Sequence, residues 1–434
     1  MTSRLHLVAC FLLVQFVSSL APAWAQYGDY ERAPINYSNA EVNDAVAQLV
    51  DKMATGEVSL NYEPGHGYLR SVLEALDVPI SSQTLVFSRT SLQLQRISPR
   101  RPRALYFSDD VYVGFCQQGD VLEIAATDAT QGATFYVMKQ DQQSSPTFVR
   151  DKGVCLSCHA SSRTQNVPGY LVRSVFTDVS GRPRFGSGTF LTDQTSNFYD
   201  RWGGWYVTGQ HGTMRHMGNT LCRGDEHTFD REPGANHQEL SKYFTVDDYL
   251  SPHSDIVALM VLEHQTQMHN AIAAANYETR LALHQCREMN KLLERPDDYL
   301  SDSTKRRIAS SVDRVLRYLL MCDEFTLTDR VVGTSEFANE FTARGKKDSA
   351  GRSLREFNLE TRLFEYPCSY LIHSHAFTKL PDEVRRPILG RLNDILSGKD
   401  TAPEFDHLSP AMRQDLTEIL RDTMPELNQL SQNH

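Results

Sequence analysis

The sequence predicts an α+β fold in which N-terminal helices and an antiparallel β-meander precede a helical C-terminal half. Three patterns support this prediction. Apolar residues recur at helical spacing in the N-terminal stretch and again from residue 247 onward. Between these stretches, residues 82–139 form short β-prone runs separated by turn residues. A region rich in glycine and aromatic residues, 147–219, connects the meander to the helical half.

Length and composition place the chain among folded globular proteins. It has 434 residues, of which 40% are hydrophobic and 23% are charged, as in ordinary globular domains. A chain of this length has room for roughly two or three domains. Its formal net charge of −10 supplies no basic surface for a nucleic acid, so we expect no nucleic-acid partner.

Residues 1–25 have the three parts of a signal peptide. Arg4 supplies the positive charge, residues 7–17 form an apolar run, and Ala23-Trp24-Ala25 forms a cleavage site. We expect export to a bacterial periplasm, or secretion, and no membrane span in the mature chain, since later apolar runs are too short. The expected divisions are the signal peptide (1–25), a mixed helical and β region (26–246) and a mainly helical region (247–434).

The N-terminal stretch predicts two helices. Asn39 is the expected N-cap of the first. Its apolar positions at helical spacing are Val42, Val46, Leu49 and Val50. The second helix is expected over residues 67–76 and ends before Pro79.

The meander is predicted from five β-prone runs: 85–87, 104–107, 111–115, 121–126 and 133–138. Aspartate, glycine and serine residues between the runs are typical of turns, and we expect Asp109 and Asp110 to lie in a solvated turn. A sheet of this kind is expected to have one buried face. Beyond it, a hairpin is expected over residues 171–185, with its turn at Ser180-Gly181.

From residue 247 onward the periodicity is helical. The expected helices are 254–293, 304–322, 335–342, 382–396 and 409–422. The charged loop at 344–352 is expected to be a solvated surface.

Residues 155–159 read Cys-Leu-Ser-Cys-His, a C-x-x-C-H motif. Two thiols three positions apart lie on one side of a tight helical turn, where they can add to the two vinyl groups of one haem. Three other uses compete. A zinc site needs a second Cys/His pair at compatible spacing, a thioredoxin-like pair needs a βαβ context, and a disulfide between Cys155 and Cys158 is strained.

The motif resembles the haem-attachment site of c-type cytochromes, on Cys155, Cys158 and His159. The resemblance implies one covalent haem c per chain, with His159 as the proximal iron ligand. The stretches 148–160 and 201–219 also look like those of large, uncharacterised exported bacterial cytochromes c. In small cytochromes c the motif lies near the N-terminus, whereas 154 residues precede it here. The small cytochrome c fold is therefore not expected, and a single motif disfavours a multihaem wire or a two-haem peroxidase.

The second axial ligand of the iron is expected in one of two places. Segment 209–218 holds His211 and His216 among glycines, which let backbone approach a macrocycle closely. His264 lies on an apolar stripe of the helix expected at 254–293, where a core histidine with satisfied hydrogen bonds is the competing interpretation. The sequence leaves the choice among these three histidines open.

Five cysteines remain outside the motif and the signal peptide: Cys116, Cys222, Cys286, Cys322 and Cys368. An odd number cannot all pair within one chain. Cys286 and Cys322 lie on consecutive expected helices and are a candidate disulfide. Buried free thiols are the alternative.

Three functional hypotheses follow from the motif and the signal peptide. The first is an exported mono-haem cytochrome that passes electrons to a periplasmic redox partner. The second is a haem oxidoreductase such as a peroxidase, because the mature chain is much longer than one haem needs for electron shuttling. The third is a non-catalytic haem sensor or an interaction protein with a helical docking half.

Overall fold

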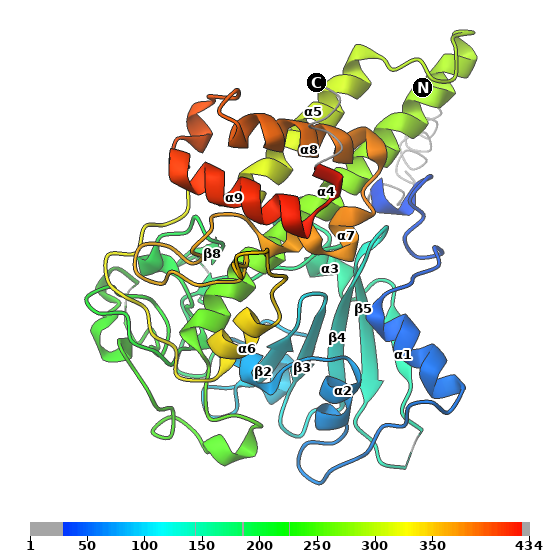
Figure 1. Ribbon diagram of the computed structural model, residues 1–434. Helices are drawn as coiled ribbons and strands as arrows, with labels where there is room; N and C mark the ends of the chain where they lie inside the picture. Colours follow the sequence, from blue (N-terminus) through cyan, green and yellow to red (C-terminus); the bar gives the residue numbers. More distant parts are fainter. Residues whose placement is uncertain (1–28, 144, 185, 225, 428–434) are drawn as a thin grey trace, which may run out of the picture.

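The computed structural model describes residues 29–427 except 144, 185 and 225. The expected signal peptide lies outside these residues. The described chain contains a seven-stranded sheet with helices on its faces (Figure 1), which agrees with a mixed α+β class. Among the described helices, none combines the length and the apolar character that a bilayer crossing requires.

The sheet is antiparallel and follows the order β6-β5-β4-β3-β2-β1-β9. Strands β1 to β5 each pair with the next strand in the chain, so the five expected runs form the expected meander, and β6 extends it. β9 pairs with β1 and adds an edge strand that the sequence pattern does not predict. The strands are β1 (Thr84–Val86), β2 (Arg103–Phe107), β3 (Val111–Phe115), β4 (Val121–Asp128), β5 (Gly132–Lys139), β6 (Phe148–Asp151) and β9 (Trp205–Tyr206).

Different helices cover the two faces of the sheet. α1 (Ala45–Ala54) and α2 (Leu69–Ala75) pack on one face, in a core that includes Tyr106, Phe115 and Leu122. The other face packs in part on α4 (Ile256–Leu292), through Phe107 and Phe135. The expectation of one buried face is therefore wrong, because the long helix covers part of the second face.

The first helix begins later than the sequence predicts. α1 starts behind the N-cap Asp44, whose carboxylate accepts two backbone N–H groups of the first turn at 2.9 Å. The same carboxylate accepts hydrogen bonds from the hydroxyls of Thr134, at 2.8 Å, and Tyr136, at 2.6 Å. The prediction of Asn39 as the cap is wrong, because Asp44 both caps the helix and ties it to β5. The second predicted helix is confirmed as α2.

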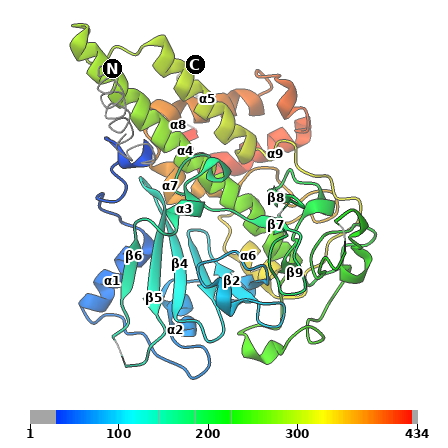
Figure 2. The same ribbon diagram turned by 180° about the vertical axis from the view of Figure 1, so that it is seen from behind.

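The helical half is organised around α4. Every residue from 256 to 277 is buried, because α4 passes between the sheet and the other helices (Figures 1 and 2). α5 (Asp302–Leu319) packs along α4, and α8 (Asp382–Leu396) packs on α5. The remaining helices of this half are α6 (Phe337–Ala343), α7 (His375–Thr378) and α9 (Pro410–Thr423). The expected C-terminal helices are confirmed, and one hydrophobic cluster joins this half to the region before it.

The hairpin of the glycine-rich region turns where the sequence predicts. The carboxylate of Asp178 accepts from Ser180 N at 2.7 Å, and Gly181 has a φ of 84°, which favours glycine. The strands pair further from the turn, as β7 (Arg173–Val175) and β8 (Thr189–Leu191). The hairpin is therefore longer than the expected range 171–185.

The seven cysteines of the described chain are all free thiols. The candidate disulfide between Cys286 and Cys322 is wrong, because α4 and α5 run antiparallel from their connection at residues 293–301. Cys286 lies close to this connection, whereas Cys322 follows the far end of α5. At 1.5 Å per residue, this places them roughly 20 Å apart along the helix axis, beyond the reach of a disulfide.

Candidate haem-attachment site

The C-x-x-C-H motif forms a one-turn helix, α3 (Leu156–His159), at the end of the edge strand β6 (Figure 2). The carbonyl oxygen of Cys155 accepts hydrogen bonds from Cys158 N at 3.2 Å and His159 N at 3.0 Å. Cys155 N donates to the carboxylate of Asp151 at 2.9 Å, so the last residue of β6 fixes the start of the turn. Cys155 is half-buried, Cys158 is exposed, and both thiols are free.

A backbone carbonyl orients the His159 ring. Nδ1 of His159 donates to Gly169 O at 2.9 Å, and the ring centroid lies 4.9 Å from that of Phe135. Because a carbonyl oxygen only accepts, this bond places the proton on Nδ1 and leaves the lone pair on Nε2. Burial lowers the pKa of His159, which keeps the imidazole neutral. A neutral imidazole with a lone pair on Nε2 is the form that binds iron.

Helix α4 holds the carbonyl that orients His159. Nδ2 of Asn270 donates to Tyr170 O at 2.7 Å, and Oδ1 of Asn270 accepts from Tyr170 N at 2.8 Å. Gly169 permits this close approach, since a Cβ there would lie 2.2 Å from Asn270 Oδ1. Asn270 is fully buried. The Gly169 carbonyl is therefore fixed to the longest helix of the protein.

The sheet beside α3 presents a partly open surface. Along β4, the residues on this face are half-buried: Val121, Glu123, Ala125 and Thr127. Arg103 on β2 pairs with Glu123 at 2.8 Å. The Glu123 charge raises the pKa values of Cys155 and His159, and the Arg103 charge lowers them. Gly114 leaves room for the Arg103 side chain, because a Cβ on residue 114 would clash with the guanidinium group. The surface next to the motif thus combines small and apolar side chains with one ion pair.

These residues fit a covalently bound haem. Burial, followed by the charge of Asp151, raises the pKa of Cys155 to about 12, so this sulfur is present as the thiol that adds to a vinyl group. The buried Nε of Arg103 has no hydrogen-bond partner, which leaves a donor for an acidic group of a ligand. Within the described part of the chain, no group of three or more His, Cys, Asp and Glu side chains is placed to hold a metal ion. A haem iron needs only His159 from the motif, because the macrocycle provides four nitrogens.

His211 and His216 lie together, with ring centroids 4.7 Å apart, and both are buried. Nδ1 of His211 donates to Met214 O at 2.8 Å, and its Nε2 accepts from Asn236 N at 3.0 Å. Nδ1 of His216 accepts from Gly218 N at 3.0 Å, which places the proton on Nε2, where the ring has no partner. To bind iron, either ring would have to release a hydrogen bond or change its tautomer.

The glycines around these histidines serve packing within the chain. A Cβ on Gly209 would lie 2.3 Å from Ile256, at the start of α4. A Cβ on Gly212 would lie 2.5 Å from the side chain of Asp329. The sequence pattern predicts a close approach to a macrocycle, and the structure shows a close approach to the chain's own helix and loop.

His264 is fully buried on α4. Its Nε2 lies 2.8 Å from Ser369 Oγ and its Nδ1 lies 3.4 Å from Gln194 Oε1. Burial lowers the pKa of His264 to about 3. In the described structure, none of the three candidate histidines makes a hydrogen bond or a ring contact with α3. The identity of the sixth ligand therefore stays a prediction.

The turn between β2 and β3 contacts charged and polar side chains from distant parts of the chain. Asp109 pairs with Arg355, and the Asp109 carbonyl accepts from His269 Nε2 at 2.7 Å. Burial raises the pKa of Asp110, against an opposing effect of His269. Asp109 and Asp110 are both half-buried, so the turn is only partly solvated, because α4 packs against it. No local signal predicts this cluster, since Asp109 and Arg355 are 246 positions apart.

A buried ion pair ties the glycine-rich region to α4. Nη1 of Arg201 lies 3.0 Å from a carboxylate oxygen of Glu263, and their side chains are only 4% and 0% exposed. Arg201 also donates to Gln194 O at 3.1 Å and Ser196 O at 2.7 Å. The helical pattern carries no signal for this partner, because Arg201 and Glu263 are 62 positions apart.

Comparison of the chain with known proteins finds no matching family model, curated protein or solved structure.

Proposed function

We propose that the protein is an exported mono-haem c-type cytochrome that transfers electrons. The orientation of His159 carries this proposal. Its Nδ1–H is held by Gly169 O at 2.9 Å, directly after two free thiols on a one-turn helix. Iron-binding histidines generally donate their second ring nitrogen to a carbonyl or carboxylate, which fixes the tautomer and raises the basicity of the ligand.

In this proposal the residues of the chain attach and orient haem c. The sulfurs of Cys155 and Cys158 hold the haem through thioether bonds, and Nε2 of His159 is the proximal ligand. Asn270 keeps the Gly169 carbonyl in place, and so keeps the His159 ring in its orientation. When bound, the haem supplies a one-electron couple between ferric and ferrous iron.

The exposure of the attachment point supports electron exchange with a periplasmic redox partner. Cys158 is exposed, and nearby Val154 has 62% of its surface exposed. A partner can therefore reach the attachment point without displacing other elements. Transient redox encounters need only a small contact area.

The hydrogen bonds of the candidate sixth ligands favour a second function. His211 and His264 use both ring nitrogens, and His216 carries its proton on Nε2. If these rings stay as they are, the sixth position is open to an external ligand, as in a haem oxidoreductase such as a peroxidase. A high-spin spectrum with turnover of peroxide would support this function. A low-spin iron that does not react with cyanide or peroxide would support the electron carrier.

Replacing both cysteines of the motif tests the proposal. The wild-type chain and the Cys155→Ser/Cys158→Ser variant are produced in a periplasm with c-type maturation machinery, and haem is stained on a denaturing gel. We expect covalent haem in the wild type and its loss in the double variant. The matched control is Cys286→Ser, which removes a buried thiol outside the motif and should keep the haem. Haem that stays with the double variant would overturn the proposal.

A further inference from the structure

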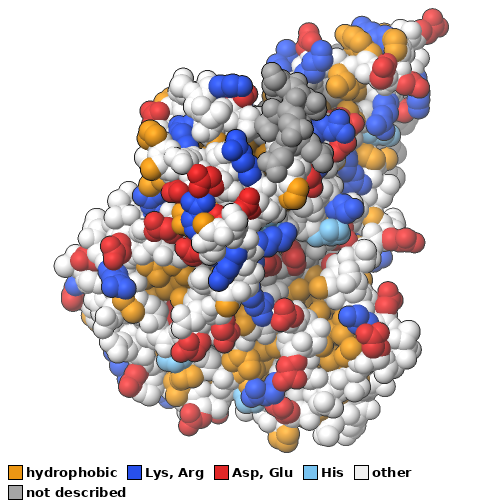
Figure 3. All heavy atoms as spheres, viewed as in Figure 1, with side chains coloured by type: hydrophobic (Ala, Val, Ile, Leu, Met, Phe, Trp, Pro, Cys, Tyr) orange, Lys and Arg blue, Asp and Glu red, His pale blue; other side chains and the backbone are white. Residues whose placement is uncertain are grey.

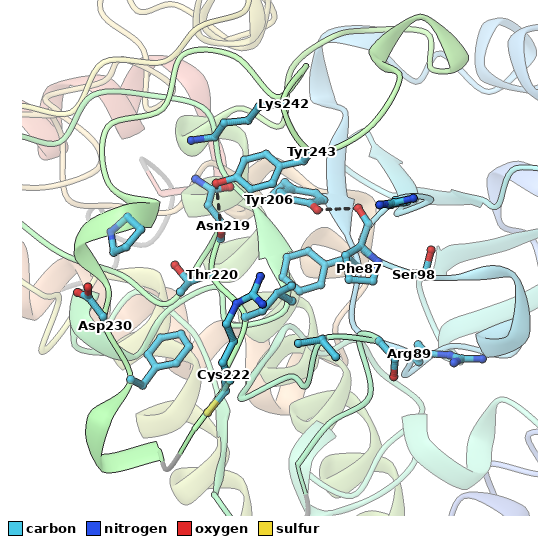
Figure 4. Close-up of a pocket in the computed structure, with 18 of the residues that line it drawn as sticks. Phe87, Arg89, Ser98, Tyr206, Asn219, Thr220, Cys222, Asp230, Lys242 and Tyr243 are labelled. Atoms are coloured by element: carbon cyan, nitrogen blue, oxygen red, sulfur yellow. Dashed lines mark hydrogen bonds between the residues drawn. The ribbon is translucent and has the colours of Figure 1, made fainter.

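A cavity of about 940 Å³ lies beside β1 and β9, at the opposite edge of the sheet from β6 and the C-x-x-C-H motif. Residues from the ends of these strands, from the hairpin turn at 179–180 and from the stretches 219–224 and 228–233 line it (Figure 4). Small-molecule sites generally have volumes of about 300–1,000 Å³. The cavity is therefore large enough for an organic ligand, and its lining includes no residue of the proposed haem site.

Cationic side chains dominate the charged lining of this cavity: Arg89, Arg100, Arg101, Arg223 and Lys242. Asp230 is the one carboxylate among the described lining residues. Arg89 and Arg101 donate to carbonyl or amide oxygens rather than to carboxylates. By contrast, basic and acidic side chains are interspersed over the face of the molecule seen in Figure 3. The cavity thus collects positive charge that the described chain leaves largely uncompensated.

Aromatic rings form one wall of the cavity. The ring centroids of Phe87 and Tyr206 are 4.7 Å apart, and those of Tyr206 and Tyr243 are 4.9 Å apart. Nζ of Lys242 lies 4.9 Å from the centre of the Tyr243 ring, and Figure 4 shows it at the upper end of this row. Both tyrosine hydroxyls donate to backbone carbonyls, at 2.6 and 3.1 Å. The rings are therefore fixed, and their hydroxyls are already satisfied. Phe87 and Tyr206 are only 1% and 2% exposed, so they support the wall from behind, and Tyr243 is the partly exposed ring of the row.

We propose that this cavity binds an organic anion, an apolar group that carries a phosphate or carboxylate. The partly exposed rings of Phe229 and Tyr243 offer a contact surface for its apolar part. Guanidinium and ammonium groups without carboxylate partners form charge-assisted hydrogen bonds with its acidic group. A neutral ring compound would leave the excess positive charge uncompensated, so the acidic group sets the preference. The proposal does not depend on the presence of haem.

Flavin mononucleotide is a suitable probe, and riboflavin is its matched control because it has the same ring system without the phosphate. Isothermal titration calorimetry of the purified mature chain at low ionic strength measures both affinities. We expect flavin mononucleotide to bind at least about tenfold more tightly than riboflavin, because charge-assisted hydrogen bonds are the stronger kind. Inorganic phosphate, added as a competitor, should weaken the binding of flavin mononucleotide and leave that of riboflavin unchanged.

Two double variants locate the binding site. Arg101→Gln/Lys242→Gln removes two exposed cations from the cavity and should weaken flavin mononucleotide binding by about tenfold or more. Lys305→Gln/Arg306→Gln makes the same change of charge at two exposed residues of α5 and should leave the affinity unchanged. Because all four side chains are exposed, neither variant removes a core contact.

The proposal is wrong if flavin mononucleotide does not bind at millimolar concentration, or binds no more tightly than riboflavin. It is also wrong if the two double variants lose affinity equally, since a general charge effect would then explain the binding. The same titration of the Cys155→Ser/Cys158→Ser chain should give the wild-type affinity. This titration therefore distinguishes a chain that attaches no haem from a chain whose cavity binds no anion.

Discussion

Replacing Asn270 tests whether α4 positions His159, the proposed proximal ligand. Asn270→Ala removes the hydrogen-bond partner of both Tyr170 N and Tyr170 O, and both bonds are buried. A buried polar group left without a partner destabilises a protein by about 1–3 kcal/mol. Two such groups give an expected decrease of about 2–6 kcal/mol in the free energy of unfolding, measured by urea denaturation followed by circular dichroism.

The haem signal shows whether this change reaches His159. Gly169, whose carbonyl accepts from His159 Nδ1, directly precedes Tyr170, so releasing Tyr170 loosens that bond. A weaker bond lowers the basicity of the imidazole. Ferric iron is then stabilised less, and we expect the midpoint potential of Asn270→Ala to rise in a potentiometric titration of the main haem absorption band.

Asn290 provides the matched control on the same helix. It is buried, and its Nδ2 donates to Pro296 O at 3.1 Å and Tyr299 O at 2.9 Å. These carbonyls lie in the exposed connection to α5, where water can replace the amide. We therefore expect Asn290→Ala to lose only about 1 kcal/mol and to keep the wild-type potential. Wild-type stability of Asn270→Ala, or a potential equal to that of Asn290→Ala, would refute the positioning role.

Three further predictions concern a glycine, a buried histidine and the thiols. Gly169→Ala keeps Asn270 but places a Cβ 2.2 Å from its Oδ1, so it should raise the midpoint potential as Asn270→Ala does; an unchanged potential would contradict this. Burial lowers the pKa of His264 from 6.5 to about 3, so the folded chain binds fewer protons than the unfolded chain, and stability is lost as the pH falls below 6.5. Urea denaturation at pH 7 and pH 4 measures this loss in the free energy of unfolding. In His264→Gln the loss at pH 4 should be smaller by about 3 kcal/mol. An unchanged pH dependence would show that His264 is not buried as a neutral ring. Cys158 is exposed, whereas Cys368 is buried with its pKa raised to about 12 by burial. Before haem attachment, iodoacetamide should therefore modify Cys158 in the native chain and Cys368 only in denaturant, as read by mass spectrometry of peptides; modification of native Cys368 would disprove its burial.

Elements that depend on local pattern are the ones the sequence predicts well. The strands of the meander and the long helix α4 follow from periodicity, because each has many apolar residues in register. The start of α1 does not, since Asp44 is selected as the cap by Thr134 and Tyr136, which lie about 90 positions away. Burial of the second face of the sheet depends in the same way on a helix that follows much later in the chain.

In the candidate site, too, the residues that are adjacent in sequence are predicted and the distant ones are not. Cys155, Cys158 and His159 are adjacent in sequence, so the motif alone predicts a haem-attachment turn. Asn270, which fixes the carbonyl that orients His159, is 100 positions from the Tyr170 backbone that it holds. The helical pattern does not predict this role, because it does not distinguish an asparagine that bonds a distant backbone from any other buried residue of the helix. The same holds for the cationic cavity, whose lining comes from six separated parts of the described chain.

A pyridine haemochrome spectrum of the purified mature chain tests the covalent haem most directly. The protein is produced in a periplasm with c-type maturation machinery and is then extracted with acidified acetone, which removes haem that is not covalently bound. We predict that one haem per chain remains with the protein, with the absorption bands of a haem whose two vinyl groups have reacted. A chain that keeps no haem after extraction would contradict the proposal and would return Cys155 and Cys158 to zinc or disulfide chemistry.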